Sequence, residues 1–162
     1  MRTFLNVAEK PSAAREISGA IARSLQAQAS TRNTVAQYNK VIEFQAQLNS
    51  IPTQLVFTSV TGHLKSSDFE DRYRKWGSCD PSVLLDPTSS QVTWFVPEEK
   101  RTVEQNLRQE ARRAHTLVLW LDCDSEGEKI AQDVADVCKS ANRNLVVKRA
   151  RFSAMTGPEL MH

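Results

Sequence analysis

Four carboxylates occupy alternate positions in the segment from 122 to 128, directly after an apolar block. They are Asp122, Asp124, Glu126 and Glu128. Like charges at this spacing repel one another unless a cation binds among them or the side chains spread into water. Carboxylate oxygens are the ligands that Mg²⁺ prefers, but Asp, Ser and Glu are also common at the starts of helices. The pattern alone therefore leaves two interpretations open, a cation site and an exposed helix start.

A second acidic position follows another apolar segment, close to the start of the chain. Glu9 and Lys10 come directly after the segment 3–8, which has the composition of a short buried strand. Ligands of open α/β sheets bind beyond the carboxyl ends of the strands, and Asp122 also follows an apolar strand pattern. If the two strands are neighbours, we expect Glu9, Asp122 and Asp124 to converge in one crevice.

The elements that would position these acids alternate between strand patterns and helix patterns, which predicts an α/β domain with a mainly parallel sheet. Gly127, just after the acids, has no side chain, which indicates that something approaches the backbone closely there. The polar segment 26–39 predicts a mobile loop, and the segment 79–91, with two Asp-Pro steps, predicts mostly loop. The expected strands are 3–8, 40–48, 54–61, 116–121 and 145–147, and the expected helices are 11–25, 69–76, 98–115 and the segment that follows the acids.

Composition restricts the class of protein without defining its partner. The 162 residues suffice for one domain with a core, and a net charge of +2 neither indicates nor excludes nucleic-acid binding. No apolar run approaches the roughly 20 residues that cross a bilayer, so we expect no membrane partner. Three cysteines without a CxxC pair argue against a disulfide framework and a zinc site, which favours a reducing compartment.

Six segments, in this order, resemble a known family: FLNVAEKPSAAREIS, YNKVIEF, FTSVTGHLKSSDF, RKWGSCDPSVLL, LVLWLDCDSEGEKIA and VVKRARFSAMT. The DxDxEGE pattern after an apolar strand resembles the TOPRIM domain of topoisomerases, bacterial-type primases and some nucleases. The six segments together resemble the N-terminal region of eukaryotic topoisomerase III, a type IA topoisomerase, and its alpha form most closely. The resemblance implies a Rossmann-like TOPRIM domain, with a mainly parallel sheet flanked by helices and an inserted strand pair. Residues 1–162 would be a single domain of a longer enzyme.

The resemblance also implies roles for the acidic residues. The family's enzymes cut one DNA strand, pass another strand through the gap and reseal it. Glu9 matches an essential acid near the scissile phosphate that helps in metal binding or proton transfer, and Lys10 matches a lysine that stabilises charge there. Asp122, Asp124 and Glu126 match the acidic triad that holds Mg²⁺. The resemblance thus favours the cation site over the helix start.

Three further residues are expected to contact nucleic acid: His63 from the family pattern, and Arg149 and Arg151 beyond the last strand. Ser125 stands where relatives commonly carry Arg, which removes a basic residue that could contact phosphate. No tyrosine in this chain matches the family's nucleophile motif. We therefore expect the isolated chain to be inactive on its own.

The partners implied are single-stranded DNA, met through the full-length enzyme, and the remaining topoisomerase domains. A helicase and OB-fold accessory proteins are implied as further partners, with a location in the nucleus and also in the mitochondrion. Two other functions remain open. One is a TOPRIM nuclease that uses the same acids and metal without a tyrosine. The other is a non-catalytic module that docks a partner protein.

Overall fold

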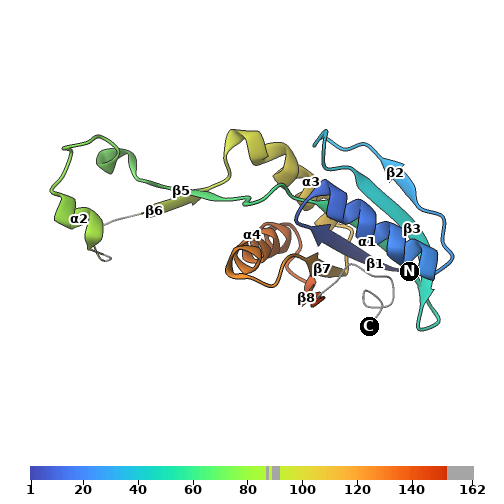
Figure 1. The fold of residues 1–162 in the computed structure, drawn as a ribbon. Coiled ribbons are helices and arrows are strands. Elements are labelled where there is room, and N and C mark those ends of the chain that lie inside the picture. The colour runs from blue at the N-terminus through green and yellow to red at the C-terminus, as the bar shows by residue number, and fades with distance from the viewer. Residues whose placement is uncertain (87, 89–91, 153–162) are drawn as a thin grey trace.

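A six-stranded sheet in the order β2-β3-β4-β1-β7-β8 forms the centre of the domain (Figure 1). The computed structural model describes residues 1–86, 88 and 92–152. β4, β1, β7 and β8 are parallel, and β3 runs antiparallel to β4 and β2. The strands are β1 (Arg2–Ala8), β2 (Ser30–Arg32), β3 (Val41–Leu48), β4 (Ile51–Ser59), β7 (Thr116–Trp120) and β8 (Val146–Arg149), and the main helices are α1 (Pro11–Ser24), α3 (Arg101–Ala111) and α4 (Ser125–Ala141). The expected α/β fold with a mainly parallel sheet and an antiparallel strand pair is confirmed.

Helices cover both faces of the sheet, and each face has its own apolar core. α1 packs on one face, where Ile17 belongs to one cluster of buried side chains with Phe44 and Phe57. α3 and α4 cover the other face, where the core includes Leu107 and Ile130. Burial of each such side chain contributes about 1.5–3 kcal/mol. Because β1 and β7 lie in the middle of the sheet, they are buried on both sides, and the loops that leave their ends are fixed at one end.

A separate two-stranded ribbon projects from this body (Figure 1). It pairs β5 (Ser66–Phe69) with β6 (Val92–Phe95), and its outer end carries a single 3-10 turn (Asp71–Tyr73) and the short helix α2 (Pro81–Leu85). The helix expected over 69–76 is therefore wrong, because Phe69 pairs across the ribbon and only a single turn follows it. A helix was also missed within the segment expected as loop, where Asp80 caps Pro81–Leu85 by accepting a hydrogen bond from the Ser82 amide at 2.8 Å. Positions 87 and 89–91 of that segment lie outside the described residues.

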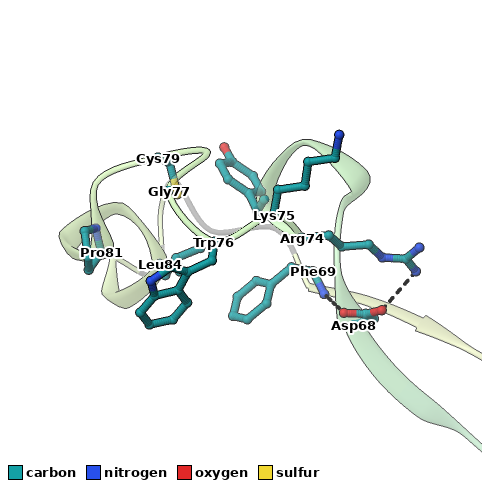
Figure 2. Close-up of a pocket in the computed structure, with 10 residues that line it drawn as sticks. Asp68, Phe69, Arg74, Lys75, Trp76, Gly77, Cys79, Pro81 and Leu84 are labelled. Carbon is teal, nitrogen blue, oxygen red and sulfur yellow. Dashed lines mark hydrogen bonds and ion pairs between the residues drawn. The ribbon is translucent and has the colours of Figure 1, made fainter.

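The outer end of the ribbon encloses a hollow with a volume of about 540 Å³, lined by apolar and charged side chains (Figure 2). Trp76 on its rim is fully exposed. Arg74, also on the rim, is paired with Asp68 at 2.9 Å. At its base the ribbon is tied to α4, because Lys65 pairs with Asp136 at 2.7 Å.

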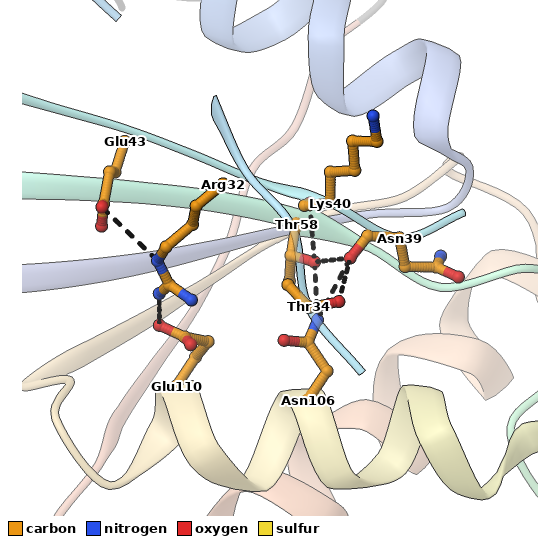
Figure 3. Close-up of polar contacts among 8 residues, drawn as sticks. All are labelled: Arg32, Thr34, Asn39, Lys40, Glu43, Thr58, Asn106 and Glu110. Atoms are coloured by element: carbon orange, nitrogen blue, oxygen red, sulfur yellow. Dashed lines mark hydrogen bonds and ion pairs between the residues drawn. The ribbon is translucent and has the colours of Figure 1, made fainter. Parts of the chain in front are cut away.

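The segment 26–39, expected as a mobile loop, contains the edge strand β2 and a set of buried polar contacts (Figure 3). Arg32 of β2 pairs with the buried Glu110 of α3 at 2.7 Å and with Glu43 of β3 at 3.4 Å. The hydrogen bond that Arg32 donates to Glu110 is the main reason that the pKa of Arg32 is raised above its ordinary value. The buried Asn39 lies at the end of the same segment. These polar contacts were not foreseen, because the composition QAQASTRNTVAQYN gives no apolar pattern.

Within the part of the chain that the structure describes, no helix is both long enough and apolar enough to cross a membrane.

Candidate functional site

The two predicted acidic positions leave the same edge of the sheet. β1 and β7 are adjacent and parallel, with Ala8 opposite Trp120. Glu9 follows Ala8 directly, and Asp122 follows Trp120 by two residues. Neighbouring strands lie about 4.8 Å apart, so the loops after β1 and β7 begin side by side. The prediction of a shared crevice required β1 and β7 to be neighbours, and the structure meets this condition. The convergence of the Glu9, Asp122 and Asp124 side chains stays a prediction.

Asp124 is the N-cap of α4, which is the alternative role left open for the acidic segment. Its backbone is extended, and its Oδ1 accepts a hydrogen bond from the Gly127 amide at 2.6 Å. A capping carboxylate satisfies one of the free amides of the first turn and lies at the positive end of the helix dipole. Since this contact uses only Oδ1, the second oxygen of Asp124 is left for another ligand. The cap and a cation site are therefore compatible.

Gly127 allows the acidic loop to fold back on the first turn of α4. A Cβ atom built at Gly127 would lie 2.1 Å from the backbone oxygen of Asp122 and 3.1 Å from Oδ1 of Asp124. Real Cβ atoms essentially never approach another atom within 3.0 Å. The close approach that the sequence indicated is thus made by the chain's own loop. Only glycine permits this placement of the backbone that carries both aspartates.

Arg149, at the end of β8, holds the same loop from the other side. Its Nη2 donates to the backbone oxygen of Asp122 at 2.8 Å, and its Nη1 donates to the oxygen of Leu119 at 3.1 Å. Both Nε and Nη2 lie 3.1 Å from Oε1 of Glu128 in α4. One guanidinium therefore joins the end of β7, the acidic loop and the first turn of α4. Arg149 was expected to contact nucleic acid, which is untested; its loop-fixing role depends on the register between β7 and β8, which no sequence pattern displays.

Glu126 and His63 face each other across the edge of the site. Nε2 of His63 lies 3.5 Å from Oε1 of Glu126, and both side chains are exposed. His63 follows Gly62, whose φ of +68° is the left-handed conformation that glycine adopts most readily. The segment from β4 therefore reaches α4 at its N-terminal turn. His63 thus lies beside the predicted acidic triad, although its contact with nucleic acid stays a prediction.

The remaining predicted site residues are placed as follows. Lys10 is exposed and is the N-cap residue of α1, without a side-chain cap hydrogen bond. Arg151 is exposed, beyond the end of β8. Glu9 is partly buried and Asp122 is exposed. Lys10 and Glu9 are therefore brought to the edge that carries Asp122, while Arg151 lies past the neighbouring strand.

The donor chemistry of this edge suits a hard cation, but the side chains do not form a closed cage. Asp122, Asp124, Glu126 and Glu9 offer oxygen atoms only, as Mg²⁺ requires. Among the described residues, no group of three or more His, Cys, Asp or Glu side chains lies in an arrangement that could hold a metal ion. Mg²⁺ is commonly bound by one or two carboxylates together with water and substrate phosphate oxygens. The residues fit an open site of that kind better than a preformed cage.

Comparison with known proteins gives one family and a consistent set of relatives. The family model described as Toprim domain matches residues 4–155. The chain is 47% identical over 153 residues to DNA topoisomerase 3-alpha of Arabidopsis thaliana, a match that covers 94% of this chain and 16% of the relative. It is 41% identical to DNA topoisomerase 3 of Dictyostelium discoideum, over 98% of this chain and 19% of the relative. With human DNA topoisomerase 3-alpha the identity is 38%, over 96% of this chain and 15% of the relative. The chain thus spans less than a fifth of the length of each of these three proteins.

Proposed function

The chain belongs to the Toprim domain family, and from this premise we propose that it forms the acidic, metal-binding part of a type IA DNA topoisomerase. The activity would be cleavage of one DNA strand, passage of another strand through the gap, and religation. The observation that carries the proposal is the parallel pairing of β1 with β7, after which Glu9 and Asp122 leave the same edge of the sheet. Similarity to proteins named DNA topoisomerase 3 supports the choice of the type IA class.

Mg²⁺ is the proposed cofactor, and Asp122, Asp124 and Glu126 are the proposed ligands, with Glu9 on the adjacent strand. When bound, the ion would supply positive charge that neutralises and orients phosphate oxygens. Asp124 would contribute Oδ2, because Oδ1 caps α4. We expect weak binding by this chain alone, on the order of millimolar, because few carboxylates leave most of the coordination sphere to water.

The protein's own groups would divide the remaining work. Glu9 would hold or transfer a proton near the scissile phosphate, and the ammonium group of Lys10 would stabilise negative charge on that phosphate. Arg149 would keep the Asp122 backbone in place. The attacking hydroxyl of strand cleavage must come from another part of the enzyme, because neither Tyr38 nor Tyr73 matches the family's nucleophile motif.

The proposed partners follow from this role. The chain would meet single-stranded DNA together with the remaining domains of the topoisomerase, and a helicase and OB-fold accessory proteins are further proposed partners. The proposed location is the nucleus, with the mitochondrion as a second compartment. Cell fractionation with an antibody against this chain tests the location directly.

A plasmid assay separates the proposed function from its alternatives. Supercoiled plasmid is incubated with Mg²⁺ and the isolated chain, and the products are examined by agarose gel and by denaturing gel for covalent adducts. We expect neither relaxation nor adduct. Metal-dependent nicking that is lost in Asp122→Asn would instead support a Toprim nuclease.

A chimera supplies the positive arm of the same test. Residues 4–152 replace the matching part of Arabidopsis thaliana DNA topoisomerase 3-alpha, and plasmid relaxation is measured. We expect the chimera to relax plasmid and the Asp122→Asn chimera to lose this activity. The Asp136→Asn chimera should retain the activity; it is the control, because Asp136 is an aspartate of α4, the helix that follows the acidic loop. Equal relaxation by the Asp122→Asn and Asp136→Asn chimeras would refute the assignment of the acidic site.

A further inference from the structure

A second hollow opens at the same edge of the sheet as the acids, between α1 and the strands β2 and β3. Its volume is about 320 Å³, and its lining includes Pro11 and Arg15 of α1, Tyr38 and Lys40 of the preceding turn, and Ser59 at the end of β4. Ser59 lies opposite Ala8 in the pairing of β4 with β1. The hollow therefore lies on one side of Glu9 and Lys10, while the acidic loop after β7 lies on the other side.

The turn that carries Tyr38 and Lys40 is held in place by buried polar contacts. The side-chain amide of Asn39, only 3% exposed, donates to the backbone oxygen and to Oγ of Ser59, each at 2.9 Å. The hydroxyl of Thr58 donates to the backbone oxygen of Lys40 at 3.3 Å. Figure 3 shows Lys40 pointing away from this network, toward α1. The backbone of the turn is fixed through Asn39, whereas the side chains of Tyr38 and Lys40 are exposed to solvent.

Tyr38 is 76% exposed although the residue after it is almost fully buried. An exposed aromatic ring on a fixed backbone loses little conformational entropy when a planar group stacks on it. Burying the Tyr38 ring against the sheet would have removed apolar surface from water, and the fold does not do this. The ring is therefore available as a stacking surface beside the hollow.

The charges around the hollow are of one sign. Arg15 and Lys40 are exposed, and within the described residues neither side chain has an ion-pair partner. The lining contains no carboxylate. The hollow at the outer end of the β5–β6 ribbon differs, because its lining includes a carboxylate, that of Asp68, which pairs with Arg74 at 2.9 Å. Of these two hollows, the one beside Glu9 is suited to an anion.

We propose that this hollow is a subsite for single-stranded nucleic acid, in which Arg15 and Lys40 bind a backbone phosphate and Tyr38 stacks on a base. Cations that follow the backbone together with aromatic rings that stack on bases are the usual means of binding single strands. β4 and β1 lie between β3 and β7 in the sheet, so the hollow and the acidic loop are about 15 Å apart along this edge. A strand held in the hollow would pass Glu9 and Lys10 on its way to the acids. The path of the strand toward the acids rests on the proposed function. Binding in the hollow itself does not depend on the acids.

The test is binding of a fluorescein-labelled oligothymidylate of about eight nucleotides to the whole 162-residue chain, measured by fluorescence anisotropy at low salt. Loss of one stacked base weakens binding by about five- to 150-fold, so Tyr38→Ala should show a loss in this range and Tyr38→Phe should bind as wild type does. Arg15→Ala and Lys40→Ala should each weaken binding and each reduce the slope of log K against log salt by about 0.7. Circular dichroism melts of the same variants confirm that they fold.

Three matched variants make the result specific to the hollow. Arg23→Ala removes an exposed cation from the other end of α1, and Trp76→Ala removes an exposed aromatic ring from the ribbon; both should bind as wild type does. Asp122→Asn should bind at least as well as wild type, even if the proposed metal site proves wrong. Absence of wild-type binding, equal losses in Arg23→Ala and Lys40→Ala, or a loss in Trp76→Ala without a loss in Tyr38→Ala would overturn the proposal.

Discussion

Substitution of Gly127 by alanine tests how the acidic loop is built. The new Cβ would lie 2.1 Å from the backbone oxygen of Asp122, so this loop or the first turn of α4 must move by roughly 1 Å. Overpacking of this kind costs about 1–3 kcal/mol, and loss of the Asp124 cap costs about 1 kcal/mol more. Alanine is a better helix former than glycine by about 1 kcal/mol, which opposes these costs. We expect a net loss of about 1–3 kcal/mol in the free energy of unfolding.

Gly19 of α1 supplies the matched control. A Cβ atom there would meet only the flexible guanidinium of Arg23, at 3.4 Å. Gly19→Ala should therefore leave stability unchanged or raise it by up to about 1 kcal/mol. Urea unfolding followed by circular dichroism measures both variants. For a chain of this size, the expected loss in Gly127→Ala corresponds to a fall of about 2 to 12 °C in Tm. Stabilisation of both variants to the same degree would refute the close contact between α4 and the acidic loop.

Three further predictions concern other residues: Arg149, Asp136 and Cys138. Arg149→Lys keeps the positive charge but loses the forked guanidinium group, so the free energy of unfolding should fall by about 1–3 kcal/mol. Hydrogen exchange of the backbone amides in the acidic loop should become faster, and an unchanged exchange rate would contradict the loop-fixing role of Arg149. The hydrogen bond from Lys65 lowers the pKa of Asp136 in the folded state below its ordinary 3.8. The stability that this pair contributes is therefore present above pH 3.8 and is lost as the pH falls through the folded-state pKa of Asp136. Carboxyl NMR titration should give a higher midpoint for Asp136 in Lys65→Met than in wild type. Burial raises the pKa of the Cys138 thiol to about 12, so iodoacetamide should modify the exposed Cys123 before Cys138. Equal rates of modification of the two thiols in the native state would show that α4 opens readily.

The central sheet was predictable because its strands carry strong apolar patterns. The run Thr116–Trp120 is continuous, and the stripe of Ile17 and its neighbours has helical spacing, so both identified their elements. The alternation of strands and helices predicted a mainly parallel sheet, but it did not predict the order of the strands. That β1 lies between β4 and β7 depends on tertiary packing, which a single sequence does not display.

The ribbon and the edge strand were missed for physical reasons. β5 begins with two serines and an aspartate, and its partner β6 lies far along the chain, so no local pattern announces the pairing. β2 has three residues and is held to α3 by the Arg32–Glu110 ion pair rather than by apolar burial. Polar contacts between distant residues leave no periodic signal in the sequence.

The carboxylates of the candidate site could be predicted from the sequence, but the contacts that hold their loop in place could not. Asp122 and Asp124 stand out because like charges are crowded after an apolar strand. The cap at Asp124 was one of two interpretations, and the structure shows this cap, which is made through Oδ1. Arg149 gave no indication that it fixes the loop, because its partners are backbone oxygens brought near by the β7–β8 register.

The central claim is that Glu9 and the acids after β7 bind one divalent cation at the shared edge of β1 and β7. The most direct measurement is a titration of the ¹⁵N-labelled chain with Mn²⁺, followed by loss of amide signals, with Mg²⁺ as competitor. Paramagnetic broadening should begin together at Glu9, Lys10 and the segment 122–126, and Mg²⁺ on the order of millimolar should reverse it. Asp122→Asn should abolish the broadening at both strand ends, whereas Asp136→Asn should not. Broadening confined to 122–126 with Glu9 unaffected, or broadening that survives in Asp122→Asn, would contradict the claim.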